Sequence, residues 1–307
     1  MTVSTKSRRS ARLPSWLQRR IPRLAECSAV ENAVRGYNLH TVCREALCPN
    51  RAECYSRRKA TFLVLGGVCT RGCRFCAVSR GTPKAPDPDE PIRLAKAVNL
   101  MRLAHVVVTS VTRDDLPDGG AGVFADTVRA LKRLDDPPVV EVLVPDFRGS
   151  SASLTTVLEA APEIFSHNIE TVRRLYDTVR RGADYERSLS ILSKAKRIRE
   201  EVITKSSLIL GLGETTEEVL GAFRDLRRSS VECLTVGQYL RPGLEQAPVR
   251  RYISPERFAW FKEEALRLGF RDVAAGPLVR SSYQDVRLDL HERWWCSGGQ
   301  KTRGGTV

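Results

Sequence analysis

The chain has 307 residues, of which 42% are hydrophobic and 28% are charged, a composition that indicates a globular protein with a large buried core. No apolar run approaches the ~18 residues of a membrane-spanning helix, and the first residues lack the apolar core of a secretory signal. We therefore expect a cytoplasmic protein without a membrane role, in which disulfides are rare and clustered thiols bind metal.

Basic residues outnumber acidic residues by 50 to 36, which gives a net charge of +14. Half of this excess lies in residues 1–25, which contain seven Lys or Arg side chains and no carboxylate. Such a segment attracts an acidic protein, a nucleic acid or an anionic lipid, although a solubilising tail has the same composition. The Arg- and Ser-rich start also resembles an organellar transit peptide, so a location in an organelle matrix stays open.

Apolar, β-branched runs alternate with helical patterns along most of the chain. The runs predict strands at residues 62–65, 106–111, 139–144, 164–169, 203–210 and 233–236. Helical spacing predicts helices at residues 89–104, 121–134, 151–161, 171–181, 185–200, 215–228 and 254–268. This alternation predicts an α/β fold, a partial (β/α)6 TIM-like barrel with N-terminal and C-terminal extensions, and a doubly wound open sheet is the alternative.

Chemistry in such a barrel is expected at the carboxyl ends of the strands. Several polar or glycine-containing segments fall at these ends, and their candidate binding residues are Thr109, Asn168, Glu170, Gly211 and Glu214. Asn168 and Glu170 are two residues apart, so on a strand their side chains point the same way. Gly211 would permit a close approach of the backbone to a bound molecule.

Six of the nine cysteines form two triplets between positions 43 and 76. The first, with spacing C-x4-C-x5-C, consists of Cys43, Cys48 and Cys54. The second, with spacing C-x3-C-x2-C, consists of Cys69, Cys73 and Cys76. A structural zinc site usually has four ligands arranged in C-x2-C pairs, whereas three thiolates leave one iron of a four-iron cluster for another group. Iron–sulfur clusters are therefore the main hypothesis, and zinc with a distant fourth ligand is the alternative.

The second triplet, with the aromatic Phe75 before its last cysteine, resembles the signature of the radical S-adenosylmethionine (SAM) superfamily. That resemblance implies a [4Fe-4S] cluster whose open iron takes the amino and carboxyl groups of S-adenosyl-L-methionine. In this superfamily Phe75, Thr109, Asn168, Glu170, Gly211 and Glu214 would lie near the bound cofactor.

Longer strings resemble the lipoyl synthase family within that superfamily, from about residue 13 to residue 283. They are NLHTVC at 38–43, CPN at 48–50, EC at 53–54, CTRGCRFC at 69–76, TSVTRDDLPDGG at 109–120, HNIET at 167–171, GLGE at 211–214, GQYL at 237–240 and VRSSY at 279–283. The resemblance implies a second, auxiliary [4Fe-4S] cluster on the first triplet, completed by the hydroxyl of Ser282, with Ser281 as the close alternative. Two residues that follow the last string, Gln284 and Asp285, depart from the family pattern.

The implied activity is that of a sulfurtransferase in lipoate biosynthesis, with no catalytic residue beyond the cluster ligands. It would insert two sulfur atoms, taken from the auxiliary cluster, at C6 and C8 of a protein-bound octanoyl-lysine. Because an unactivated methylene has no acidic proton, the cofactor must supply the hard chemistry and the protein must position it. Two C–H bonds imply two S-adenosylmethionine molecules for each product.

The implied partners are octanoylated lipoyl carrier domains of a dehydrogenase E2 subunit or of the glycine cleavage H protein. A ferredoxin- or flavodoxin-type donor would supply electrons, and we expect a monomer without a nucleic-acid partner. Lipoyl carrier domains tend to be acidic, so the basic segment that includes Arg19, Arg20 and Arg23 would favour their docking. Two alternatives stay open, another radical SAM enzyme that inserts sulfur or modifies RNA, and a zinc module that binds nucleic acid.

We expect four regions along the chain. Residues 1–58 form an N-terminal extension with the auxiliary-cluster motif, and residues 59–250 form the radical SAM barrel. Residues 251–285 form a C-terminal element with the serine loop, and residues 286–307 form a tail of unknown role that contains Trp294, Trp295 and Cys296.

Overall fold

A single curved sheet organises the molecule in a computed structural model that describes residues 13–18 and 24–282. Eight strands pair in the order β1-β2-β5-β6-β7-β8-β9-β10, and every pair from β2 onward is parallel. The strands are β1 (His40–Thr41), β2 (Thr61–Val64), β5 (His105–Ser110), β6 (Val139–Leu143), β7 (Ile164–Ser166), β8 (Ile203–Leu210), β9 (Cys233–Gln238) and β10 (Asp272–Gly276). The six predicted strands are confirmed as β2 and β5 to β9.

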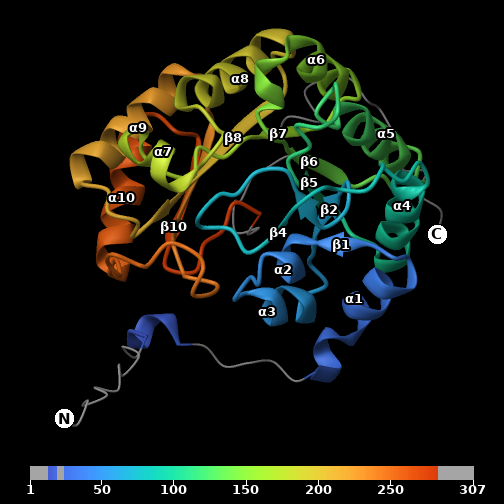
Figure 1. The fold of residues 1–307 in the computed structure, drawn as a ribbon, viewed down its shortest axis with the longest axis horizontal. Coiled ribbons are helices and arrows are strands. Elements are labelled where there is room, and N and C mark those ends of the chain that lie inside the picture. Colours follow the sequence, from blue (N-terminus) through green and yellow to red (C-terminus); the bar gives the residue numbers. More distant parts are fainter. Residues whose placement is uncertain (1–12, 19–23, 283–307) are drawn as a thin grey trace, which may run out of the picture.

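The long helices lie along the outer face of this sheet, as Figure 1 shows. They are α4 (Glu90–Met101), α5 (Ala121–Lys132), α6 (Ser151–Glu159), α8 (Tyr185–Ile198), α9 (Thr216–Arg228) and α10 (Pro255–Arg267). A doubly wound sheet would reverse its strand order at a switch point and carry helices on both faces, whereas these parallel strands follow chain order throughout. The predicted partial barrel is therefore confirmed, and the open-sheet alternative is wrong.

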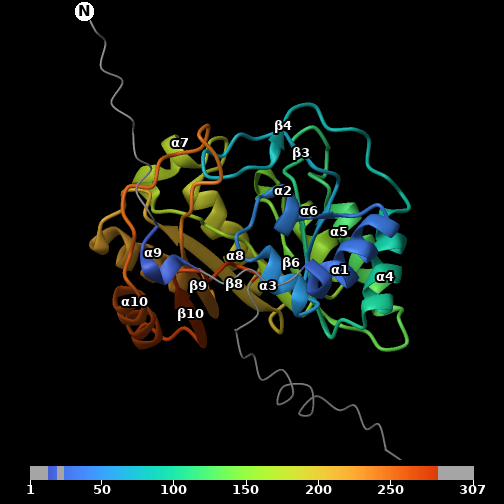
Figure 2. The same cartoon turned by 90° about the horizontal axis from the view of Figure 1, so that it is seen from below.

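Further elements occupy the opening and one end of the barrel. Helices α1 (Leu24–Gly36), α2 (Val42–Glu45) and α3 (Arg51–Ser56) lie near the edge formed by β1, which pairs antiparallel with β2. Strands β3 (Val68–Cys69) and β4 (Ser79–Arg80) form a separate two-stranded unit at one end of the barrel (Figure 2). One turn of 3-10 helix, η1 (Ser15–Leu17), precedes them in the chain.

The helix predicted at residues 171–181 is wrong. The backbone N–H of Glu170 still pairs with Ser207 of β8, and Val172 is extended, so the chain cannot become helical at the predicted start. Only two short pieces form, η3 (Arg173–Leu175) and α7 (Tyr176–Val179). The strand predicted at 164–169 ends at Ser166, apart from an isolated bridge between Glu170 and Leu208.

Strand β10 is a seventh parallel strand that the sequence pattern did not predict. Its residues DVAAG contain one β-branched side chain, and its register is set by pairing with β9 rather than by an apolar run. The predicted strands, in contrast, are almost continuously buried, as expected for a sheet covered on both faces. Among the described residues, no helix combines the length and apolar character needed to cross a bilayer.

A buried ion pair links two of the central strands. Lys205 on β8 places Nζ 3.0 Å from both carboxylate oxygens of Glu141 on β6, and Ser166 on β7 donates to the same carboxylate at 2.8 Å. Both charged side chains are almost fully buried, at 5% and 1% exposure. Each charge therefore depends on its partner to offset the loss of hydration.

Replacing Lys205 by Met should destabilise the protein, because Glu141 would keep a buried charge without its partner. We expect a loss of about 3–5 kcal/mol in the free energy of unfolding, measured by guanidinium titration of the metal-free protein. The double variant Glu141→Gln/Lys205→Met removes both charges and should recover part of the loss. An unchanged unfolding midpoint in the single variant would show that the pair is not desolvated.

Candidate active site

A cavity of about 750 Å³ opens at the carboxyl ends of the strands. Its volume lies within the ~300–1,000 Å³ range of small-molecule sites. The wall includes all three cysteines of the second triplet, two from the first triplet, and strand-end residues from β5, β8 and β9. The segments that the sequence analysis placed at strand ends are thus largely brought to one space.

The second triplet occupies the connection between β3 and β4. Cys69 ends β3, and the Cys76 N–H donates to the Cys73 carbonyl at 3.1 Å in a tight turn. Two cysteine sulfurs accept backbone N–H groups at 3.4 Å, from Arg71 to Cys69 and from Val78 to Cys76. Hydrogen bonds of this kind stabilise thiolates and tune the potential of a bound cluster.

Arg71, between Cys69 and Cys73, anchors this loop to the barrel. Its guanidinium donates to Asp114 at 2.6 and 2.8 Å and to Asp146 at 2.7 and 3.0 Å. Burial alone would raise the pKa of Asp146, but the charge and hydrogen bonds of Arg71 hold it well below its usual value. Because Asp114 follows β5 and Asp146 follows β6, one side chain fixes the loop to two strand ends.

Four of the six residues expected near the cofactor line the cavity, namely Phe75, Thr109, Asn168 and Glu170. Asn168 Nδ2 donates to Glu170 Oε1 at 2.9 Å, so the two side chains do point the same way. Asn168 Oδ1 is buried and has no hydrogen-bond partner in the structure, which leaves an acceptor available to a ligand. Glu170 adopts a left-handed backbone conformation at φ 63°, a strain that is typical of functional sites.

Arg180 is a cavity residue that the sequence analysis did not identify. Its guanidinium donates to the Tyr176 hydroxyl at 2.7 Å and to Ser188 Oγ at 2.9 Å, and it lies 3.2 Å from His167 Nε2. Burial raises the pKa of Cys73 to about 11, and the Arg180 charge opposes that rise. The side chain therefore brings a fixed positive charge to the second triplet.

Gly211 and Glu214 are not among the residues that line the cavity. A Cβ on Gly211 would overlap Gln238 Nε2 and the Arg251 carbonyl oxygen, and φ is +105°, so glycine is required here by the protein itself. The Glu214 carboxylate accepts the N–H groups of Gly211, Leu212 and Gly213 at 2.6, 2.9 and 3.0 Å. These two residues shape the turn after β8 behind the cavity wall.

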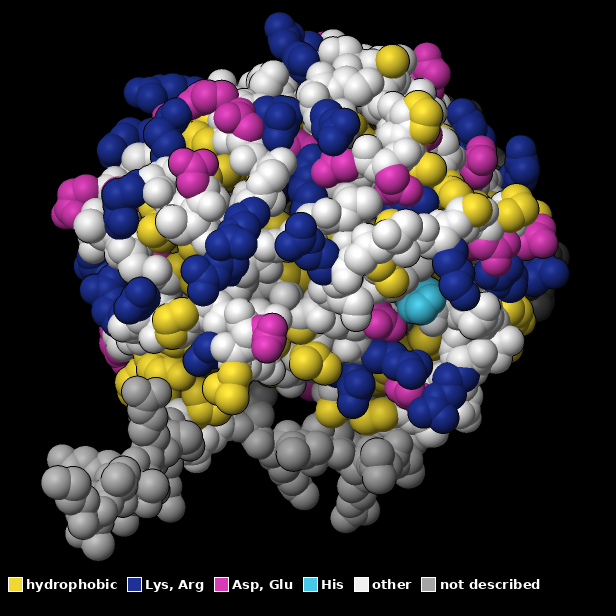
Figure 3. Space-filling view, viewed as in Figure 1, with side chains coloured by type: hydrophobic (Ala, Val, Ile, Leu, Met, Phe, Trp, Pro, Cys, Tyr) yellow, Lys and Arg dark blue, Asp and Glu magenta, His cyan; other side chains and the backbone are white. Residues whose placement is uncertain are grey.

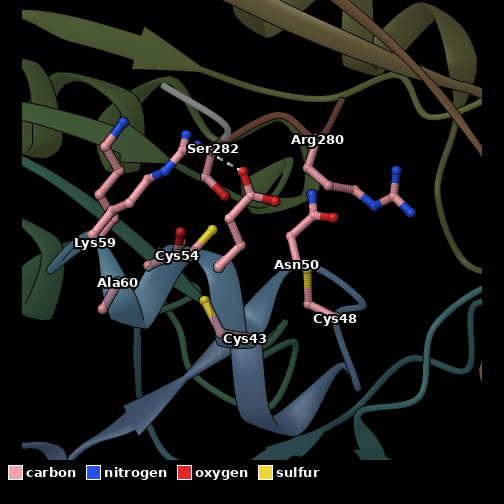
Figure 4. A pocket seen from close by; sticks show the side chains of 11 residues that line it. Cys43, Cys48, Asn50, Cys54, Lys59, Ala60, Arg280 and Ser282 are labelled. Carbon is pink, nitrogen blue, oxygen red and sulfur yellow. Dashed lines mark ion pairs between the residues drawn. The ribbon is translucent and has the colours of Figure 1, made fainter. Parts of the chain in front are cut away.

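The first triplet lines a second, smaller pocket together with Ser282 (Figure 4). Cys43 belongs to α2, Cys54 to α3, and Cys48 to the turn between these helices. Ser282 comes from the segment that follows β10. Ser281 lines the large cavity but is not among the residues of this pocket.

Two contacts position the segment that carries Ser282. The buried Asn50, between Cys48 and Cys54, donates from Nδ2 to the Leu278 carbonyl at 2.7 Å. On β9, a Cβ at Gly237 would overlap the Val279 carbonyl oxygen, so the segment crosses the strand end directly against the backbone. The segment that carries Ser282 is thus held beside the first triplet, although the two are far apart in the sequence.

The two donor sets consist of thiolates, which are soft ligands suited to iron–sulfur clusters or to zinc. Within the described residues, no group of three or more His, Cys, Asp or Glu side chains is close enough to hold one metal ion. Thiolates are the usual ligands of iron–sulfur clusters, and each triplet leaves one iron of a four-iron cluster to another group. Burial raises the pKa of both Cys43 and Cys76 to about 12, so iron must replace the thiol protons when a cluster binds.

Other features of the sequence lie outside the described residues. These are Arg19, Arg20, Arg23, Gln284, Asp285, Trp294, Trp295 and Cys296. None of the described cysteines forms a disulfide. Arg71 and Asn50 stand inside the quoted motifs, but their spacing gives no sign of the partners that the structure brings to them.

Two sequence family models match the chain. The model of the radical SAM superfamily matches residues 63–226, which is more than half of the chain. The model of the N-terminal domain of lipoyl synthase matches residues 2–48.

Individual relatives agree with both models. Lipoyl synthase from Koribacter versatilis is 50% identical over 281 residues, which covers 92% of this chain and 92% of the relative. Lipoyl synthase from Geobacter sulfurreducens is 53% identical over 272 residues, which covers 89% of each chain. The crystal structure of methylornithine synthase matches with a TM-score of 0.52 at 16% identity, over 68% of this chain and 61% of that chain, and this likeness concerns the fold alone.

Replacing Asn50 by Ala should loosen the Ser282 segment, because the Leu278 carbonyl would lose its buried donor. We expect an unfolding free energy lower by about 1–3 kcal/mol and a first-triplet cluster that loses iron faster to a chelator. Iron at the second triplet should be unchanged. Asn99→Ala, at an exposed position on α4, is the matched control. Equal iron loss from both sites would contradict this role.

Replacing Arg71 by Lys keeps the charge but removes the paired hydrogen bonds to Asp114 and Asp146. We expect the second-triplet cluster to bind about 10- to 100-fold more weakly, as for other outer contacts of metal ligands. Iron content and the electron paramagnetic resonance signal of the reduced protein report this loss. Arg93→Lys, in an ion pair with the exposed Asp87, serves as the control and should leave both readouts unchanged.

Proposed function

The chain belongs to the lipoyl synthase family of the radical SAM superfamily, and we propose that it acts as a lipoyl synthase on a protein-bound octanoyl group. The observation that carries this proposal is that both cysteine triplets open into one cavity. Cys43 and Cys48 line the same space as Cys69, Cys73 and Cys76. An acyl chain in this space would have access to cysteines of both triplets.

We assign one [4Fe-4S] cluster to each triplet. Cys69, Cys73 and Cys76 would hold the cluster that binds S-adenosylmethionine, with Phe75, Thr109, Asn168 and Glu170 beside the cofactor. Cys43, Cys48, Cys54 and Ser282 would hold the auxiliary cluster. When bound, these groups would supply a radical able to break unactivated C–H bonds and the sulfur atoms inserted at C6 and C8.

Ser282 is the better candidate than Ser281 for the fourth auxiliary ligand. It shares the small pocket with all three cysteines of the first triplet, whereas Ser281 lines only the larger cavity. A serine oxygen is a harder ligand than a thiolate and is poorly matched to iron–sulfur chemistry. Such a bond suits a cluster that must be dismantled to release sulfur.

The protein's own residues would orient the reactants and exclude water. Arg71 fixes the second-triplet loop, and Arg180 holds a positive charge near Cys73. Asn168 Oδ1, which is buried without a partner, is available to accept a hydrogen bond from the cofactor. Apolar side chains such as Leu63, Val111 and Leu143 line the cavity and would surround an alkyl chain. A dry wall protects a reactive intermediate from side reactions.

We infer the carrier protein, the electron donor, the oligomeric state and the location from family membership, as in the sequence analysis. The substrates would be octanoylated carrier domains of a dehydrogenase E2 subunit or the glycine cleavage H protein. The donor would be of ferredoxin or flavodoxin type, the protein a monomer, and its location the cytoplasm. The chain would have four regions: the extension with the auxiliary-cluster motif (1–58), the barrel (59–250), the element with the serine loop (251–285) and the tail (286–307).

The test is an anaerobic reaction of reconstituted protein with S-adenosylmethionine, reductant and an octanoylated carrier domain. We expect 5′-deoxyadenosine and a carrier mass increased by two sulfur atoms, from a protein that binds about eight irons per chain. If no 5′-deoxyadenosine forms, or if the carrier gains no sulfur, the result contradicts the proposal.

Variants separate the two clusters in the same reaction. Cys73→Ala should lose 5′-deoxyadenosine, whereas Cys54→Ala should still form it but insert no sulfur, and each should keep about half of the iron. Ser282→Ala should lose sulfur insertion while Ser281→Ala keeps it. The opposite result for the serine pair would move the fourth ligand to Ser281.

A further inference from the structure

The wall of the large cavity carries far more positive than negative charge. Six arginines and two glutamates line it. Arg71 is saturated by Asp114 and Asp146, and Arg180 is held by Tyr176 and Ser188 inside the wall. Three other arginines of the wall, Arg74, Arg80 and Arg181, are exposed.

These three exposed arginines surround the second-triplet loop on a fixed backbone. Arg74 lies within the loop, and its N–H donates to the Val179 carbonyl at 2.8 Å, while its own carbonyl accepts from Ala247 at 2.7 Å. Arg80 lies over the loop, since a methyl group on Gly72 would come within 3.2 Å of its Cδ. Figure 3 shows several Lys and Arg side chains across the middle of this face, with Asp and Glu side chains among them.

No carboxylate of the described residues forms an ion pair with Arg74, Arg80 or Arg181. Many exposed arginines elsewhere are paired within their own helix, for example Arg35 with Glu31 and Arg267 with Glu263. Unpaired positive charge around a cavity mouth raises the local concentration of negative partners and steers their approach.

An exposed leucine lies between residues that line the cavity, Pro242 and Glu245. Leu244 is 87% exposed, the highest value among the large hydrophobic side chains of the described residues. It stands on the loop after β9, where Arg241 donates to the Gln246 carbonyl at 2.9 Å and Gln246 Nε2 donates to the Cys76 carbonyl at 3.3 Å. An apolar side chain on a braced loop, beside charges, is typical of an anchor at a protein–protein interface.

We propose that Arg74, Arg80, Arg181 and Leu244, here called the cationic rim, form the docking surface for the acidic protein that presents the acyl-lysine. This inference rests on the proposed function, because it names how the carrier is recognised. An acyl group tethered to a folded carrier reaches the cavity only when the carrier surface lies against the mouth. The charge of the rim selects an acidic carrier, and Leu244 supplies a desolvated contact.

The test compares two substrates with the variant Arg80→Glu/Arg181→Glu, which leaves residues 69–76 unchanged but alters two side chains of the cavity wall. The substrates are an octanoylated carrier domain of net negative charge and a short octanoyl-lysine peptide without charged neighbours. We expect kcat/KM for the carrier to fall by about tenfold or more at low salt, because attraction becomes repulsion. This deficit should shrink at high salt, which screens exposed charges. Turnover of the peptide reports any damage to the cavity itself, so the measured quantity is the ratio of kcat/KM for the carrier to kcat/KM for the peptide, which should fall by about tenfold at low salt.

The control is Arg102→Glu/Arg133→Glu, which makes the same change in net charge at two exposed positions that follow α4 and α5. Since helices α4 and α5 run back along the sheet, their last residues lie at the opposite end of the barrel from the cavity mouth. The control should process the carrier nearly as well as the parent. Leu244→Ala should weaken carrier binding at low and high salt alike.

Carrier binding is also measured directly, by fluorescence anisotropy, so that the rim is tested whether or not sulfur is inserted. Equal carrier affinity in the rim variant and the parent would overturn the proposal. So would an equal loss of activity on carrier and peptide, since that indicates damage to the cluster site. Loss of RNA binding with unchanged carrier binding would assign the rim to nucleic acid instead. A parent protein that binds the carrier but converts neither substrate would contradict the proposed function while leaving the rim supported.

Discussion

The ionic contact between Arg71 and two aspartates holds the second-triplet loop against the ends of the barrel strands, and the chemistry of the site depends on this placement. A loop that carries three half-buried thiols between two-residue strands has little regular structure of its own. Arg71 ties it to the ends of β5 and β6 through Asp114 and Asp146, and Arg187 on α8 adds a further bond to Asp146 at 2.8 Å. The sheet thereby fixes where the thiols lie relative to the cavity wall. The position of the loop in turn determines the shape of the cavity.

Much of the barrel could be predicted because its strands are buried on both faces and therefore read as continuous apolar runs. Strand β10 was not predicted, because the strand conformation of DVAAG depends on pairing with β9 rather than on an apolar pattern. A helix was wrongly predicted at residues 171–181, because the backbone pairing of Glu170 overrides the helical pattern. Cysteine spacing predicted both triplets. The role of Arg180 could not be predicted, because it depends on contacts with Tyr176, Ser188 and His167. The periodicity of the sequence does not show which of these side chains contact one another.

Two glycines near the site show how a missing side chain lets one part of the protein approach another. Gly211 is expected from the sequence to admit a ligand, and in the structure its missing side chain makes room for Gln238 and the Arg251 carbonyl. Gly237 lets the segment after β10 lie against β9, which carries Ser282 toward the first triplet. In both places the absence of a Cβ allows one part of the protein to pack on another, and the site is built from the result.

The close approach at Gly237 also sets an order of events during synthesis. Cys43, Cys48 and Cys54 leave the ribosome early, whereas the segment that meets them through Asn50 and Leu278 lies 228 residues later. Contacts this distant in sequence form only when nearly the whole chain is available. A chain that stops early would display three thiols without the serine, so the first pocket is complete only in the finished polypeptide.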